Sequence, residues 1–301
     1  MTVRKPLDSS IGIESSADSD FIAGLISELR ALQPDSALAK QLWDIGLLTG
    51  WRQRADGSFG PENFERGLLL YRMVAEARPK RILEVGTGRG FGSIVMATSA
   101  EDNGLDTIID TIDLLSSDTF RDWPIQLNGY DEVGHSSPSD LWQKYFKQSV
   151  LAHVNTHTGD SNKVLKRLLK DGVQYDMIFI DAGHDPYHAI LDLTYGIAML
   201  EPGGIGLLDD FAPEAPYGLG AVMALPHLKK YFQKISVVAT SGKIWPIESP
   251  SEYPHGMVLL SGRKNKNYHI ERKRLLWWRI MGSLMDLSYS GRRAFPLLET
   301  R

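Results

Sequence analysis

Two acidic strand ends and a neighbouring histidine are the residues of this chain whose types and spacing most directly indicate chemistry. Asp181 ends the apolar run YDMIFID, and Asp209 and Asp210 end the run GGIGLLDD. Ligands of open α/β sheets bind beyond the carboxyl ends of the strands, so neighbouring strands would bring three carboxylates together. No Lys or Arg adjoins them in the sequence. Mg²⁺ or another divalent cation would balance this charge, which predicts a metal site at Asp181, Asp209 and Asp210.

His184 follows Asp181 by three residues and is the candidate catalytic base. A neutral imidazole near a substrate hydroxyl can take its proton, because its unperturbed pKa of about 6.5 suits that task near neutral pH. The residues leave alternatives open. A lone histidine is more often structural than catalytic, and one of the aspartates could simply cap the segment that follows it. His135 and His188 are rival candidates for the base.

A glycine-rich loop, RILEVGTGRGFG, supplies the candidate cofactor site. It places Gly86, Gly88 and Gly90 after a predicted strand and before a predicted helix. Glycine permits backbone angles and a close ligand approach that a Cβ would block. Dinucleotide-binding proteins use a similar loop, but their GxGxxG fingerprint ends in a small residue, usually glycine or alanine. Phe91 or Ser93 stands at that position here, so a dinucleotide is disfavoured.

The loop matches the pattern ExGxGxG with Glu84 as its acid, and in this the chain resembles the class I S-adenosylmethionine-dependent methyltransferases. The resemblance implies that Glu84 and the glycines lie against the methionine part of S-adenosylmethionine. It also implies that an acid ending the second strand binds the ribose hydroxyls, a role that falls on Asp113, with Asp110 as the second choice. Asp160 and Ser161 would contact the adenine, although Asp160 could instead only cap the next helix.

The strand-end carboxylates extend the resemblance to the metal-dependent O-methyltransferases, both the catechol type and the bacterial types that methylate sugars and natural products. Asp210 stands where the catechol type has an asparagine, which argues against a catechol substrate, and His184 stands where it has its lysine base. The resemblance implies methyl transfer to a hydroxyl of a small molecule such as a sugar or natural-product intermediate. The alternative is a protein of this fold that binds S-adenosylmethionine but catalyses a non-methylating reaction or uses the cofactor structurally.

The elements that must position these residues alternate, from Arg81 onward, between short apolar runs and amphipathic stretches. This alternation predicts an α/β protein with a mostly parallel sheet, and the resemblance implies a Rossmann-like methyltransferase fold of seven strands with helices on both faces. The segments KISVVAT and GMVLLSG are expected to form an antiparallel edge pair. The predicted organisation is a flexible tail (1–19), an N-terminal helical cap (20–61), a cofactor-binding domain (62–262) whose insertion (114–150) walls the substrate, and a basic C-terminal helical extension (263–301).

The composition narrows the possible partners. The formal net charge of −4 provides no global field for a polyanion, so we expect no nucleic-acid partner. The chain has no cysteine, which excludes disulfides, thiolate metal ligands and a cysteine nucleophile. It shows neither an apolar signal segment nor a membrane-spanning stretch, so we expect a cytoplasmic protein. The basic C-terminal helix is expected to pack on the domain or on a second copy in a homo-oligomer, with contact to a membrane surface as the alternative.

Overall fold

The computed structural model describes residues 36–53, 59–61, 64–127, 130–183, 186–211, 220–221, 224, 228, 230–240 and 255–264. The predicted tail, nearly all of the C-terminal extension, the loop around Trp245 and the candidate base His184 lie outside these residues. None of the described helices combines the length and the apolar content that a membrane span requires.

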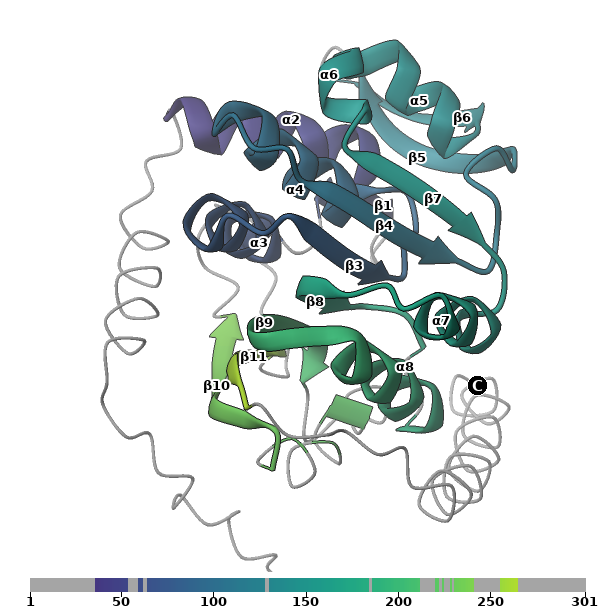
Figure 1. The fold of residues 1–301 in the computed structure, drawn as a ribbon. Coiled ribbons are helices and arrows are strands. Elements are labelled where there is room, and N and C mark those ends of the chain that lie inside the picture. Colours follow the sequence, from purple (N-terminus) through teal and green to yellow (C-terminus); the bar gives the residue numbers. More distant parts are fainter. Residues whose placement is uncertain are drawn as a thin grey trace, which may run out of the picture.

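A seven-stranded sheet forms the centre of the described fold (Figure 1). Its strand order is β10-β11-β9-β8-β3-β4-β7, in which β9, β8, β3, β4 and β7 are parallel and β11 is antiparallel to both of its neighbours. The predicted mostly parallel sheet with an antiparallel edge pair is thereby confirmed. The strands span Arg81–Val85 (β3), Ile108–Asp113 (β4), Val154–Thr158 (β7), Tyr175–Ile180 (β8), Leu200–Phe211 (β9), Phe232–Thr240 (β10) and His255–Arg263 (β11).

The sheet is buried on both faces, which explains why its strands read as nearly unbroken apolar runs. On β3, Ile82 belongs to one core cluster and Leu83 to the other, and Met177 and Ile178 divide β8 in the same way. Helices α3 and α4 cover the first face, and α7 and α8 cover the second, as a Rossmann-like fold requires. These helices span Phe64–Ala77 (α3), Phe91–Asp102 (α4), Ser161–Lys170 (α7) and Pro186–Met199 (α8).

Smaller elements pack beside α3 and α4. Helix α2 begins after the N-cap Ser36 and contacts both of these helices as well as strand β5. The predicted insertion contains an antiparallel hairpin, β5–β6, that the sequence did not indicate because proline disfavours a strand. Pro124 is tolerated because a two-stranded ribbon consists only of edges. The remaining elements span Ala37–Thr49 (α2), Trp51–Gln53 (β1), Phe59–Pro61 (β2), Arg121–Leu127 (β5), Tyr130–Ser136 (β6), Pro138–Tyr145 (α5) and Gln148–Leu151 (α6).

Candidate active site

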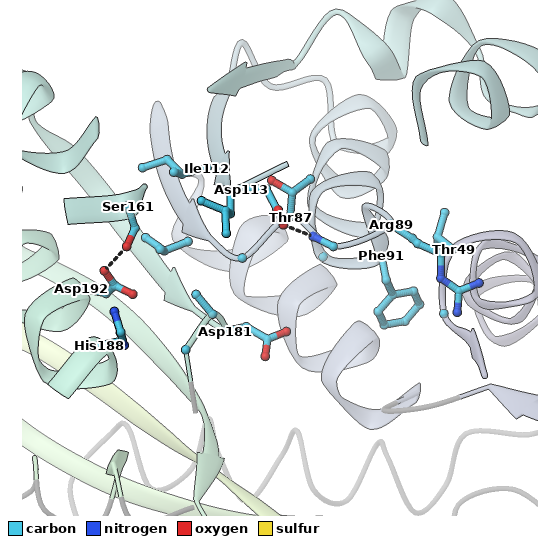
Figure 2. Close-up of a pocket in the computed structure, with 18 of the residues that line it drawn as sticks. Thr49, Thr87, Arg89, Phe91, Ile112, Asp113, Ser161, Asp181, His188 and Asp192 are labelled. Carbon is cyan, nitrogen blue, oxygen red and sulfur yellow. Dashed lines mark hydrogen bonds between the residues drawn. The ribbon is translucent and has the colours of Figure 1, made fainter. Parts of the chain in front are cut away.

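A cavity of about 740 Å³ opens beyond the carboxyl ends of β3, β4 and β8 (Figure 2). The sheet side of its wall includes the ends of these strands, the residues that follow them, the first turn of α7 and part of α8. The opposite side includes Thr49 at the end of α2 and Trp123 of the β5–β6 hairpin. A cavity of this size suits a cofactor and a small molecule, and it lies where ligands of open α/β sheets bind.

The glycine loop borders this cavity through Gly86 and Gly88, whereas Gly90 does not line it. Gly86 has a φ of +105°, and a Cβ there would lie 1.9 Å from the carbonyl oxygen of Asp181. Only glycine therefore allows β3 and β8 to end so close together. Gly90 faces the indole of Trp142, which a Cβ would approach to 2.2 Å. Two of the predicted glycines border the cavity, and the third provides room for packing.

Asp113 ends β4 and lines the cavity, as the ribose prediction requires. Its Oδ2 accepts a hydrogen bond from the backbone N–H of Gly88 at 2.8 Å, and its Oδ1 accepts one from the N–H of Leu115 at 2.9 Å. Each carboxylate oxygen has two lone pairs, so both can still accept from a ligand hydroxyl. Asp113 is therefore held rigidly against the glycine loop while keeping acceptor capacity for adjacent hydroxyls.

Asp110, the second choice for the ribose contact, lies inside the sheet instead. Its side chain is 1% exposed and accepts from Arg81 Nη2 at 2.6 Å and from the Tyr175 hydroxyl at 3.1 Å. A ring nitrogen of His157 lies 2.9 Å away. Burial raises the pKa of Asp110, but hydrogen bonds from His157 and Arg81 outweigh it and lower the pKa to about 2. Asp110 thus stabilises the sheet as a carboxylate.

Asp160 and Ser161 lie at the start of α7, and both line the cavity. Asp160 is also the N-cap of the helix, because its side chain accepts from the N–H of Lys163 at 3.3 Å. The two roles considered for Asp160 are therefore compatible. Ser161 donates to Asp192 Oδ1 at 2.7 Å, and His188 lies on the same side of the cavity (Figure 2). Asp192 and His188 are cavity residues on α8 that the sequence motifs did not assign to the cofactor.

Glu84 lies beneath the glycine loop and does not line the cavity. It is 1% exposed, and its Oε2 accepts from the hydroxyls of Thr111, at 2.6 Å, and Ser93. Burial raises the pKa of Glu84 to about 7, although the hydrogen bonds from Ser93 and Thr111 act in the opposite direction. Glu84 therefore joins β3 to β4 and α4 below the loop. Its direct contact with a cofactor stays a prediction.

The acidic strand ends have a counter-charge that the sequence did not indicate. Arg66 Nη1, from α3, donates to Asp181 Oδ2 at 2.5 Å and also to Asp209 Oδ2. Burial lowers the pKa of Arg66, but the charges of Asp181 and Asp209 outweigh burial and raise it, so the guanidinium stays charged. Burial raises the pKa of Asp181 well above its usual range, and Arg66 opposes that rise. Because 115 residues separate Arg66 from Asp181, no local pattern could have revealed the pair.

The predicted metal site is not confirmed by this arrangement. In the part of the chain that the structure describes, no group of three or more His, Asp or Glu side chains is placed to hold a metal ion. Mg²⁺ requires oxygen ligands at about 2.0 to 2.1 Å, and the Oδ2 atoms of Asp181 and Asp209 instead contact the Arg66 guanidinium. The residues as arranged do not fit a divalent cation, and binding by these two aspartates and Asp210 stays a prediction.

The β5–β6 hairpin borders the cavity through the aromatic ring of Trp123 and through Pro124. Arg89, from the glycine loop, donates from Nη1 to the Pro124 carbonyl oxygen at 2.5 Å. The same guanidinium lies 5.0 Å from the centroid of the Trp123 ring, within the range of a cation–π contact. The predicted insertion therefore borders the cavity, at the place expected for a substrate wall.

A comparison with protein families agrees with this geometry. The family model described as a methyltransferase domain matches residues 83–211, from β3 to the end of β9. Residues 83–211 of this chain form a methyltransferase domain. The resemblance stated from the glycine loop is thereby confirmed, and the chain is an enzyme, a methyltransferase. A comparison with curated proteins found no match.

Solved structures share the fold of this methyltransferase at low sequence identity. A putative O-methyltransferase from Klebsiella pneumoniae is 18% identical, with a TM-score of 0.51, over 80% of this chain and 96% of that one. The O-methyltransferase from Bacillus cereus, solved with S-adenosylhomocysteine, is 15% identical, with a TM-score of 0.51, over 80% and 97%. TomG from Streptomyces achromogenes, an O-methyltransferase of tomaymycin synthesis solved with S-adenosylmethionine, is 17% identical, with a TM-score of 0.51, over 83% and 100%.

Asp113→Ala is expected to weaken S-adenosylmethionine binding by this methyltransferase by about 10- to 100-fold, because hydrogen bonds to a charged group contribute about 1.5 to 3 kcal/mol. The variant removes the predicted acceptor for the ribose hydroxyls and the observed acceptor for the N–H of Gly88. Isothermal titration calorimetry measures the change. Asp106→Ala is the matched control, since Asp106 is exposed and does not line the cavity. Equal affinities of the two variants would contradict the ribose assignment.

Glu84→Gln is expected to flatten the pH dependence of stability between about pH 4.5 and pH 7. In the folded enzyme Glu84 has a pKa of about 7, above the ordinary value of 4.5, so the folded state keeps a proton that the unfolded chain has lost. The free energy of unfolding therefore falls as the pH rises through this window and levels off above it. Urea denaturation at several pH values checks this, and parallel pH profiles for wild type and variant would contradict it.

Proposed function

We propose that this methyltransferase transfers the methyl group of S-adenosylmethionine to a hydroxyl oxygen of a small-molecule acceptor, such as a sugar or a natural-product intermediate. The observation that carries the proposal is the single cavity that Asp113, the glycine loop and Asp181 all line. The solved relatives named above include O-methyltransferases bound to S-adenosylmethionine or S-adenosylhomocysteine. Both lines of support favour a cofactor and an acceptor side by side at the strand ends.

The cofactor would lie along the sheet side of the cavity. Asp113 would accept from the ribose hydroxyls, and the adenine would extend toward Asp160 and Ser161, which line the same cavity. Gly86 and Gly88 would face the methionine part, because the loop has no side chains there to keep it away. This placement directs the methyl group toward the region between Asp181 and the far wall.

The acceptor would occupy the far side of the cavity, beneath Trp123, Phe91 and Thr49. An aromatic wall with a few polar groups suits a ring that carries hydroxyls, since apolar surface holds the ring and polar groups orient it. The methyl group would pass in line from sulfur to the acceptor oxygen, and holding the two within about 3 to 3.5 Å supplies much of the acceleration. S-adenosylhomocysteine and a methyl ether are the products.

The proton of the acceptor hydroxyl goes, in this proposal, to His184. This residue lies outside the described part of the chain, but Asp181, Ala182 and Gly183 directly before it line the cavity. The Mg²⁺ predicted at the strand ends is the part of the sequence-based function with the least geometric support, because Arg66 contacts the same oxygens. No step of the proposed reaction is therefore assigned to a metal.

The proposal is tested by incubating the full-length protein with S-adenosylmethionine that carries a deuterated methyl group and with a panel of acceptors. The panel pairs each hydroxylated sugar or phenol with its amino analogue, and mass spectrometry locates the label. Methyl ethers are expected, together with an equal amount of S-adenosylhomocysteine. Methylation of the amines alone would replace the proposal with N-methyl transfer. Cofactor binding without any methylated acceptor would favour the non-methylating alternative.

The predicted homo-oligomeric state and cytoplasmic location belong to the same proposal. Size-exclusion chromatography with light scattering tests the first, and fractionation of the source cells tests the second. A monomer, or a protein recovered with membranes, would overturn the corresponding part.

A further inference from the structure

The negative charges of Asp181 and Asp209 at the strand ends are balanced by the buried side chain of Arg66. Arg66 is 8% exposed, and its Nη1 contacts Oδ2 of both Asp181 and Asp209. Asp181 directly follows β8, and Asp209 lies on its parallel neighbour β9. One guanidinium from α3 thus joins two strand ends at the position where the sequence predicted a cation.

Two aromatic rings hold this guanidinium in place. The Cζ of Arg66 lies 5.9 Å from the ring centroids of both Phe91, on α4, and Phe179, on β8, within the range of cation–π contacts. The residue after Arg66 is Gly67, where a Cβ would lie 2.7 Å from the Phe91 ring. A glycine therefore makes room for one of the rings that cover the guanidinium. The surrounding core is built to fit Arg66, and its position is not that of a freely moving surface side chain.

A divalent ion at the same place would compete with Arg66 for the same two carboxylates. An ion bound to Oδ2 of Asp181 and of Asp209 would approach these atoms to about 2.0 to 2.1 Å, which leaves no space for Nη1 on them. Two cations in a buried site would also repel each other strongly, because the effective dielectric constant is low there. The guanidinium and the ion therefore compete for the same site.

We infer that Arg66 takes the place of the divalent cation, so that the carboxylates of Asp181 and Asp209 form an arginine-bound cluster that needs no metal. The inference concerns the site of the proposed function and rests on it for the reaction. The Nε of Arg66 is buried and has no hydrogen-bond partner among the described residues, and Arg66 lines the cavity.

The test measures Mn²⁺ binding by electron paramagnetic resonance, because the signal of the free ion is lost when it binds. Wild type and Asp209→Asn are expected to bind Mn²⁺ equally weakly. Arg66→Met, which keeps the carboxylates but removes the guanidinium, is expected to gain a site at least about tenfold tighter. Arg66→Met combined with Asp209→Asn is expected to lose the gained site, which locates it at the strand ends.

Two results would overturn the inference. One is a wild-type Mn²⁺ site that Asp209→Asn removes, and the other is a folded Arg66→Met variant that gains no site. Circular dichroism establishes whether Arg66→Met folds. If Arg66→Met does not fold, the comparison of wild type with Asp209→Asn still tests the inference. Equally weak Mn²⁺ binding by the two supports it, and tighter Mn²⁺ binding by wild type overturns it.

Failure of the proposed function is distinguishable from failure of this inference. Mn²⁺ binding is measured without an acceptor, so it gives an answer even if no hydroxyl is methylated. Where methyl transfer is observed, its rate is expected to stay unchanged in excess EDTA. A loss of rate in EDTA that added Mg²⁺ restores would contradict the inference while leaving methyl transfer established.

Discussion

Gly86→Ala is expected to lower the free energy of unfolding by about 3 kcal/mol or more and to abolish cofactor binding. Gly86 has a φ of +105°, which strains any residue with a side chain, and the new Cβ would lie 1.9 Å from the carbonyl oxygen of Asp181. Neither the backbone of Gly86 nor that of Asp181 can move easily, because both are hydrogen-bonded to neighbouring strands. The N–H of Gly86 bonds to Ile112 O at 2.9 Å, and the N–H of Asp181 bonds to Val85 O at 2.8 Å. Relief of the clash therefore requires parting of β3 from its neighbours.

Chemical denaturation measures the loss of stability, and calorimetric titration with S-adenosylmethionine measures the loss of binding. Gly104→Ala is the matched control, because Gly104 has a φ of +58° and no atom within 4 Å of an added Cβ. It carries the backbone strain without the clash, so a cost of only about 1 kcal/mol is expected. If the two variants were equally stable, close approach of β3 and β8 could not be the reason for glycine at position 86.

His184→Ala is expected to reduce the rate of methyl transfer by roughly 10²- to 10⁴-fold, the usual contribution of a general base, with little change in S-adenosylmethionine affinity. The expectation rests on its sequence position directly after Gly183, which lines the cavity, and three residues after Asp181. Single-turnover assays over a range of pH measure the rate of the chemical step. The loss should be smaller at high pH, where hydroxide or an ionised acceptor replaces the base.

His135→Ala serves as the control for this prediction. His135 lies on β6, pairs with Asp122 at 2.8 Å, has a side chain that is 67% exposed and does not line the cavity. It was a rival candidate for the base, and its variant is expected to keep the wild-type rate. A slow His135→Ala enzyme beside an unimpaired His184→Ala enzyme would exchange the two roles.

The sequence by itself determined those features that depend on neighbouring residues along the chain. The alternation of buried strands and helices predicts the mostly parallel sheet, because each element must bury its own apolar surface. The glycine spacing marks the candidate cofactor loop, because a positive φ such as that of Gly86 is a property of a single residue that glycine adopts most readily. Asp113 could be chosen as the candidate ribose acceptor because the sequence indicates where the predicted strand ends. Its competitor Asp110 lies only three residues earlier but belongs to the buried network of Arg81 and His157.

Only the tertiary structure decided how the charges are paired. Arg66 is 115 residues from Asp181 and 143 from Asp209, so their contact depends on the packing of α3 against the sheet, which no local pattern encodes. The hairpin that places Trp123 at the cavity was equally hidden, because its pairing depends on two strands of modest propensity meeting each other. Residue types and spacing identified the carboxylates, and the fold determined which positive charge meets them, because Coulomb attraction depends on distance in space.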